Sequence, residues 1–173
     1  SMNARVWLAG LLLILMPPVV MAQQDKIAVV NIQQAILLTD VAQQRLQEFE
    51  TSEDFASDRA QADALRADLA QLVKDFQRDQ AAMSEEDQVA AQQKMASKQS
   101  DFEYVAKKLQ ALAQQVQEQV IQELAPQAQE VLAEVIAADQ IGLLLQAQSV
   151  YHASISFDIT AKVTDKMNQL GAE

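Results

Sequence analysis

The sequence predicts an α+β protein in which a small body of short strands and helices carries a long antiparallel helical hairpin. Along two central stretches, apolar residues recur at alternating steps of three and four, which is the pattern of a coiled-coil seam. Short β-branched or leucine-rich runs lie near the two ends of the chain. The chain has only 3 glycines and 5% aromatic residues, a composition that favours helices over turns and glycine-rich cofactor loops.

Residues 1–22 have the pattern of a secretory signal peptide. Arg5 precedes the apolar run 6–16, which is followed by two prolines and by the small residue Ala22. The run is shorter than the about 20 apolar residues that a membrane-spanning helix needs. We therefore expect cleavage after Ala22 and export of the remaining chain, and we interpret Ser1 as a cloning remnant. An uncleaved membrane anchor is the alternative interpretation.

Charge and residue usage disfavour several classes of function. The chain carries 13 basic and 24 acidic residues, a net charge of −11, and such an acidic surface repels the phosphates of nucleic acids. It has no cysteine, and its one histidine, His152, has no nucleophile or acid at a recognisable catalytic spacing. Acidic pairs such as Glu85 and Glu86 point to diverging helix faces and lack histidine or cysteine partners. We expect no catalytic residue, cofactor or metal site.

The exported chain begins with a strand and a helix. The run 27–32 is apolar and β-branched without helical spacing, so it predicts a buried strand. Residues 33–49 place apolar side chains at helical spacing among glutamines, which predicts one helix with a buried face. The segment 50–58 is more acidic and less periodic, and a kink, a loop and a continued helix all remain open for it.

The two seams predict a coiled-coil hairpin with its reversal near 80–84. Ser84 can cap the backbone amides of a new helix, and Asp87 occupies the return position of a capping box. Each arm then spans about 40 residues, or about 60 Å at the helical rise per residue. Such a hairpin buries only one stripe per helix and must project from the body. The seams consist of Ala62, Leu65, Leu69, Leu72 and Phe76 in the first helix and of Phe102, Val105, Leu109, Leu112, Val116 and Gln119 or Val120 in the second.

Beyond the hairpin, two more strands and a final helix are expected. Pro126 removes an amide donor, so the second helix should kink or restart there. The runs 140–146 and 149–153 are typical of short strands, and Asp158 is a candidate cap for a terminal helix. Three short strands from the two chain ends leave exposed edges, which predicts self-association. The apolar face of the terminal helix holds Ile159, Val163, Met167 and Leu170.

Segments near both chain ends resemble the Skp/OmpH family of periplasmic chaperones. They are residues 26–31, 139–145 and 150–153, and the Asp-Ile-Thr at 158–160 before the last helix. The resemblance implies a homotrimer in which the strands form a small central β-barrel and the hairpins extend as three tentacles around a cavity. It also implies that unfolded outer-membrane proteins are held in this cavity without ATP or a cofactor, and so are kept from aggregating in the periplasm.

The resemblance further implies a division of the chain. Residues 23–50 and 126–173 would form the trimerisation body, and residues 51–125 the tentacle. For the trimer body we single out the apolar residues Ile27, Val29, Ile141, Leu143, Leu145 and Val150. Apolar residues that the seams do not need are candidate client contacts, and these are Phe55, Val73, Met83, Met95 and Tyr104.

The net charge of the arms differs from that of the Skp/OmpH family, because members of that family are commonly basic and these arms are acidic. Residues 39–83 hold ten acidic and five basic side chains, and residues 84–138 hold nine and four. We therefore expect no contact with lipopolysaccharide or the membrane surface, and we expect electrostatic attraction to favour basic client segments. The lysines of the second arm, interpreted as part of a solvated helix face, are Lys94, Lys98, Lys107 and Lys108.

An exported coiled-coil scaffold of the cell envelope would explain the seams equally well. The strands at both chain ends favour the chaperone, because a scaffold does not need a closed body at the base of the hairpin. A holdase suppresses the aggregation of an unfolded protein, whereas a scaffold binds one folded partner. Measuring aggregation therefore separates the two hypotheses.

Overall fold

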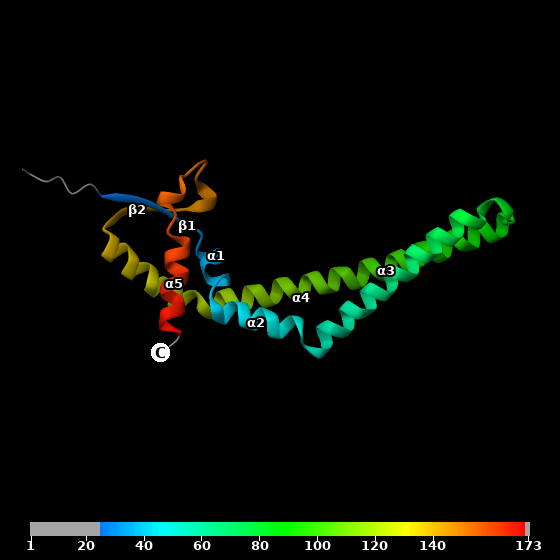
Figure 1. The fold of residues 1–173 in the computed structure, drawn as a ribbon, viewed down its shortest axis with the longest axis horizontal. Helices are drawn as coiled ribbons and strands as arrows, with labels where there is room; N and C mark the ends of the chain where they lie inside the picture. The colour runs from blue at the N-terminus through cyan, green and yellow to red at the C-terminus, as the bar shows by residue number, and fades with distance from the viewer. Residues whose placement is uncertain (1–24, 172–173) are drawn as a thin grey trace, which may run out of the picture.

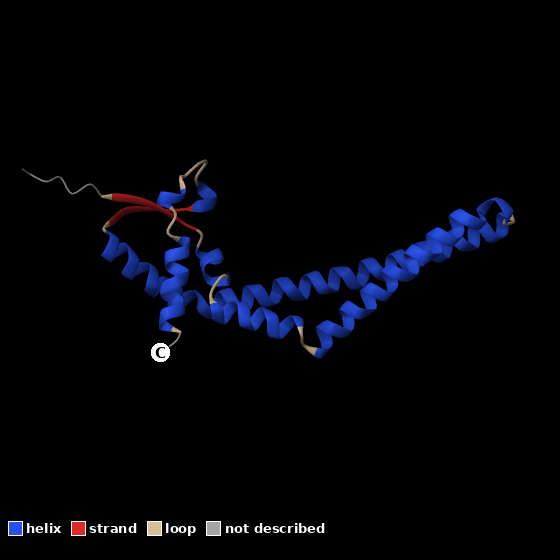
Figure 2. Cartoon of the chain, in the orientation of Figure 1, coloured by secondary structure: helices blue, strands red, loops and turns tan. Residues whose placement is uncertain are grey.

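The computed structural model describes residues 25–171, which form a mostly helical body with a small sheet and a long projecting arm (Figure 1). The expected signal peptide and Ser1 lie outside these residues. Figure 2 shows that both strands lie in the body and that the arm is helical except for a short loop at its tip. The elements are β1 (Lys26–Val30), α1 (Ile32–Leu37), α2 (Asp40–Glu50), α3 (Glu53–Asp79), the 3-10 helix η1 (Gln80–Ala82), α4 (Glu85–Asp139), β2 (Ile141–Gln146), the 3-10 helices η2 (Ala147–Ser149) and η3 (Ile155–Phe157), and α5 (Thr160–Leu170).

The stretch 33–49 forms two helices, so the prediction of a single helix is wrong. Thr39 causes the interruption, because its buried hydroxyl donates to the carbonyl oxygen of Ile36 (2.7 Å) and accepts from the amide of Ala42 (3.2 Å). These two bonds end α1 and cap α2. The side chain of Asn31 caps α1 in the same way, by accepting from the amide of Gln34 (3.1 Å).

A second break separates α2 from α3. Thr51 and Ser52 lie between the two helices, and the Ser52 hydroxyl donates to the carbonyl oxygen of Phe49 (2.6 Å). The open segment 50–58 is therefore a two-residue break followed by continued helix. Figure 1 shows that the chain turns sharply here, so that α2 and α3 run in different directions.

The arm is the predicted antiparallel hairpin of α3 and α4, with its reversal at η1 (Figure 1). Ser84 caps α4 as expected, since its hydroxyl accepts from the amide of Asp87 (3.1 Å) and donates to the carboxylate of Asp87 (2.7 Å). The seam residues Ala62, Val105 and Val120 are buried, and the remaining seam residues are half-buried except for Gln119. Val120 and not Gln119 therefore continues the second seam.

Helix α4 runs for 55 residues and includes Pro126 without a restart. Figure 1 shows that α4 changes direction in the stretch beside α5. An internal proline costs about 3 kcal/mol in a helix, but here Ala128, Val131 and Val135 follow it as fully buried core residues. Their packing keeps the helix intact. Among residues 25–171 no helix is both long and apolar enough to cross a membrane.

The sheet has two parallel strands, β1 and β2, within the described residues, so the prediction of a third strand at 149–153 is wrong. That run forms the end of η2 and an irregular loop. The other edge of β1 is occupied instead by Asp158, which bridges to Val29, and by Ile159, whose amide donates to the carbonyl oxygen of Val29 (3.0 Å). The strand-like run consequently finds no partner strand within the described chain.

Gly142 is the extra residue at a register shift between β1 and β2. Lys26 pairs with Ile141, whereas Ile27 pairs with Leu143. A Cβ atom on Gly142 would lie 2.2 Å from the Cβ of Asp25, closer than any real side chain tolerates. Glycine is required here because Asp25, the residue before β1, lies this close to the Gly142 backbone.

The core lies where α1, α4 and α5 meet beneath β1. Asp158 accepts from the amide of Thr160 (2.9 Å), which supports its predicted role in starting α5, although Ile159 occupies the capping position itself. The buried Thr160 hydroxyl accepts from the amide of Asn31 (2.9 Å) and joins the start of α5 to the end of β1. The buried cluster comprises Val30, Ala35, Ile36, Ala128, Val131, Val135, Val163 and Met167.

Candidate binding surfaces of the body and the arm

Part of one face of the sheet is uncovered. Ile27 and Leu143 are 50% and 49% exposed, and Leu145 beside them is also exposed. Parallel sheets are normally covered on both faces, so an apolar parallel face in water indicates that something else packs on it. Of the other three residues predicted for the trimer body, Val29 lies on the same face, paired with Leu145, but it is buried beside the loop that follows β2. Ile141 is half-buried against the core, and Val150 is half-buried in the loop after η2.

The loop that follows β2 carries large apolar side chains that sequence reasoning missed. Tyr151 and Ile155 are almost fully exposed, and Phe157 is exposed beside the uncovered face of the sheet. The strand predicted at 149–153 would place Tyr151 within the sheet, whereas Ile155 and Phe157 follow this run and were not among the predicted contact residues. His152 lies in this loop too, in a shallow hollow with Val150 and not in a strand.

The candidate client contacts on the arm differ in exposure. Tyr104 is 72% exposed and Val73 is exposed, whereas Met83 and Met95 are half-buried. Phe55 is half-buried because its ring packs against Phe49, with ring centroids 4.6 Å apart and planes inclined by 49°. Phe55 therefore braces the break between α2 and α3. Val89 on α4 is as exposed as the candidates but was not singled out from the sequence.

Ion pairs cross the arm between its two helices. Lys108 pairs with Asp58 (2.7 Å), and Lys98 pairs with Asp68 (3.2 Å). The hydrogen bond from Lys108 to Asp58 raises the pKa of Lys108 above its ordinary value. Two lysines of the predicted solvated face are thus engaged by aspartates of α3. Nearer the body, Arg45 of α2 pairs with Glu123 of α4.

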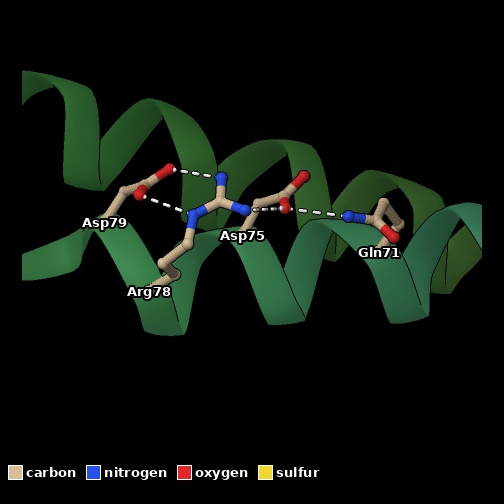
Figure 3. Close-up of polar contacts among 4 residues, drawn as sticks. All are labelled: Gln71, Asp75, Arg78 and Asp79. Atoms are coloured by element: carbon tan, nitrogen blue, oxygen red, sulfur yellow. Dashed lines mark hydrogen bonds and ion pairs between the residues drawn. The ribbon is translucent and has the colours of Figure 1, made fainter.

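A chain of polar contacts ends α3 close to the tip (Figure 3). The Arg78 guanidinium donates to both carboxylate oxygens of Asp79 (2.9 Å each) and lies 3.3 Å from Asp75, which accepts from the Gln71 amide (2.8 Å). The bond from Arg78 lowers the pKa of Asp79, and Asp79 in turn raises the pKa of Arg78. Arg78 thereby offsets two carboxylates at a helix end that is already electronegative.

The last turn of α4 is tied to α5 through one ion pair. The Lys162 ammonium donates to both carboxylate oxygens of Asp139, at 2.7 and 2.5 Å. This bond lowers the pKa of Asp139 below its ordinary value, and the charges of Lys26 and Lys166 act in the same direction. The next residue, Gln140, adopts the left-handed conformation with φ of 53°.

Comparison with known proteins identifies the chain. The family profile "Outer membrane protein (OmpH-like)" matches residues 26–167, from the first residue of β1 to the core residue Met167 of α5. The chain belongs to the OmpH-like outer membrane protein family. A crystal structure named as a candidate outer membrane chaperone (OmpH-like) from Caulobacter crescentus is similar to it, with 13% sequence identity and a TM-score of 0.47. That similarity covers 84% of this chain and 85% of the other. A search of curated proteins finds no match to the chain.

The OmpH-like match includes both the body and the arm, so the family pattern is not confined to a coiled-coil repeat. Within this OmpH-like chain, the structure brings three predicted body residues together on one surface, namely Ile27, Leu143 and Leu145. The predicted arm residues form no single cluster. They are spread from the break after α2 to the tip.

Proposed function

We propose that this OmpH-like protein is an ATP-independent holdase chaperone. It would bind unfolded outer-membrane proteins in the periplasm and prevent their aggregation. The observation that carries the proposal is the long thin arm with exposed Tyr104, Val73 and Val89, joined to a body that leaves part of an apolar sheet face uncovered. Membership of the OmpH-like family and the resemblance to Skp/OmpH chaperones support the same role.

The body would complete itself as a homotrimer. A two-stranded parallel sheet is marginal by itself, and Ile27, Leu143 and Leu145 present an apolar face that a second copy could cover. The exposed loop residues Tyr151 and Ile155 would add to the same contact. In this arrangement the strands of three chains form the small β-barrel, with 23–50 and 126–173 as body and 51–125 as tentacle. The remaining proposed contact residues are Val29, Ile141 and Val150.

Three arms around a shared cavity would hold a client through many weak contacts. Weak contacts distributed over several arms give useful affinity by multivalency, and each of them can be released without a nucleotide-driven step. Tyr104 and Val73 offer exposed surface, and the methionines Met83 and Met95 can adapt to varied side chains. Phe55 would contribute only its uncovered edge, because Phe49 covers part of its ring. No enzymatic step or cofactor belongs to this proposal.

The test is a native-mass measurement combined with an aggregation assay. An outer-membrane barrel protein is diluted from urea into buffer with and without the purified protein, and light scattering is recorded with and without ATP. We expect a mass of three chains, suppressed scattering at near-stoichiometric ratios, and no effect of ATP. A folded monomer or dimer that leaves the scattering unchanged would contradict the proposal and favour the envelope scaffold.

A further inference from the structure

We propose that Tyr151 of one copy of this chain binds in an uncharged hollow in the body of the next copy. This inference rests on the homotrimer of the proposed function and specifies which two surfaces of the chain meet in it. One protruding segment, one hollow and the distribution of charge along the chain support it.

The hollow lies at the carboxyl ends of the two parallel strands, where Val30 and Gln146 line it. It measures about 560 Å³ and extends to α4. Its apolar side consists of Ile32, Leu132 and Leu144, which are half-buried against the core. We call this hollow the amide pocket, because its exposed polar residues are the glutamines Gln33, Gln129, Gln146 and Gln148.

The segment 150–157, which we call the protruding segment, projects from the body beside the strands (orange in Figure 1). Tyr151 is fully exposed and Ile155 is 91% exposed. Tyr151 lines a different hollow, with Val29 and His152, so it does not occupy the amide pocket of its own chain. Large apolar side chains gathered on one exposed segment indicate a binding surface.

Both surfaces are uncharged, although the chain has a net charge of −11. Among residues 25–171, the two longest stretches without Asp, Glu, Lys or Arg are 27–39 and 140–157. The amide pocket is lined by residues of these stretches and by Gln129 and Leu132 of α4, and the protruding segment belongs to the second stretch. Copies of an acidic chain repel each other, and the centres of protein interfaces are depleted of charge. These surfaces are therefore the ones at which a second copy is accepted best.

A homotrimer needs two different surfaces that fit each other. A two-fold contact pairs one patch with the same patch of the partner and closes with two chains, whereas a ring of three is built from head-to-tail contacts. The protruding segment and the amide pocket provide two such surfaces. The pocket is also continuous with the uncovered part of the sheet face, because Leu145 belongs to both.

A tyrosine side chain suits both parts of the amide pocket. Its ring would pack on Ile32, Leu132 and Leu144, and its hydroxyl would bind the glutamine side chains. A buried tyrosine hydroxyl usually has a hydrogen-bond partner, and an amide can either donate to it or accept from it. The glutamines supply this partner without placing a charge in the contact.

The test maps the contacts of Tyr151 by photo-crosslinking. Tyr151 is replaced by the photoreactive residue benzoylphenylalanine in isotope-labelled protein, which is refolded together with unlabelled wild type, irradiated and analysed by mass spectrometry. We expect labelled chains joined to unlabelled chains within 30–33, 129–132 or 144–148. The matched control is the same replacement at Tyr104 of the arm, the other tyrosine of the chain, which should not crosslink to these segments.

Three outcomes of this experiment would overturn the inference. In the first, Tyr151 crosslinks only within its own chain, or to another copy only outside the three segments. In the second, Tyr104 crosslinks to the amide pocket as efficiently as Tyr151 does. In the third, Tyr151 crosslinks to an added unfolded outer-membrane protein instead of a second copy, so that the protruding segment is a client contact.

Substitutions at exposed positions test the contact from both sides. Tyr151→Ser should weaken the association of the copies about tenfold or more, as the loss of an aromatic residue central to an interface does. Gln129→Glu should weaken it about threefold to tenfold, because the ring would cover a carboxylate and remove its hydration.

The control Gln122→Glu makes the same change at an exposed position of α4 outside the amide pocket and should associate like wild type. Sedimentation equilibrium over a dilution series measures association, and circular dichroism verifies that each variant is folded. If Gln129→Glu associates like Gln122→Glu, or Tyr151→Ser like wild type, the inference is wrong.

Light scattering separates this inference from the proposed function. If wild type forms trimers and suppresses the scattering of an unfolded outer-membrane protein, but Tyr151 crosslinks elsewhere, the inference is wrong and the chaperone function stands. If wild type is a monomer, both the inference and the homotrimer are wrong. If Tyr151 crosslinks to the amide pocket of another copy but scattering is not suppressed, the inference stands and the holdase function is wrong.

Discussion

The body and the arm bury their residues to very different depths. In the body, Ile36, Val131, Val135 and Val163 have essentially no exposed surface, and three helices and a strand surround them. Helix α3, which makes half of the arm, contains one buried residue, Ala62. The body therefore holds most of the packing free energy, whereas the arm is a single seam fastened by ion pairs. A thin arm is less stable, but it leaves more side-chain surface for a partner.

The largest expected effect contrasts one leucine-sized deletion in each region. Ile36→Ala removes a fully buried side chain and should lower the free energy of unfolding by about 2–5 kcal/mol. Leu69→Ala at the half-buried arm seam should cost only about 1–2 kcal/mol, because water already reaches part of the side chain. Urea unfolding at one protein concentration measures both. Equal losses would show that the arm is as tightly packed as the body.

A second substitution acts within the body, between α4 and β2. Gln140 holds a left-handed conformation after α4, where a side chain costs about 1–2 kcal/mol relative to glycine. Gln140→Gly should raise the free energy of unfolding by a similar amount. Thermal unfolding checks the direction, with the exposed Gln122→Gly inside α4 as a control that should instead destabilise. A lower free energy of unfolding for Gln140→Gly would mean that the Gln140 side chain makes stabilising contacts that outweigh its backbone strain.

The tip provides a local test. Ser84→Ala removes the hydroxyl that caps α4 and should cost about 1 kcal/mol of helix stability. Because the tip has no buried residues nearby, we expect faster amide hydrogen exchange in the first turn of α4 and no change in the body. Slower exchange, or faster exchange in α5, would show that tip and body are coupled more tightly than the packing indicates.

The smallest expected effect is pH-dependent. Lys162 lowers the pKa of Asp139, so their bond stabilises the fold above the ordinary carboxyl pKa, and this contribution is lost as the pH falls through the lowered value. Asp139→Asn should therefore slightly lower the melting temperature at neutral pH, and the difference from wild type should shrink at strongly acidic pH. Melting curves across this range measure it. A difference that grows on acidification would contradict the assigned role of the pair.

Local periodicity was sufficient to predict the arm. The seams, the reversal and the Ser84 cap depend on residues that are close in sequence or repeat along one face, and such patterns are visible in the chain itself. Breaks inside a helix were not predictable in this way. Thr39 occupies a position that continues the helical pattern, and the bonds of its buried hydroxyl to Ile36 and Ala42 separate α1 from α2.

The structure of the body depends on contacts between residues that are distant in the sequence, so less of it could be predicted. The run 149–153 has strand-like composition, but the edge of β1 that it could have used is occupied by Asp158 and Ile159. The surroundings of the candidate contact residues depend on distant partners in the same way. Nothing in the sequence placed Phe49 of one helix against Phe55 of the next, whereas the exposure of Tyr104 follows directly from its position off the seam.

The parallel pairing of β1 and β2 also sets an order for folding. β1 ends at Val30 and β2 begins at Ile141, so the sheet cannot form until the chain has run out to the tip and returned. Closing so long a loop from a disordered chain is entropically costly. If α3 and α4 pair first, starting at the turn at the tip, they bring the two chain ends side by side. The loop that must then be closed to pair β1 with β2 is shorter. The arm would then act as the template on which the body forms, and the body would be the last part to fold.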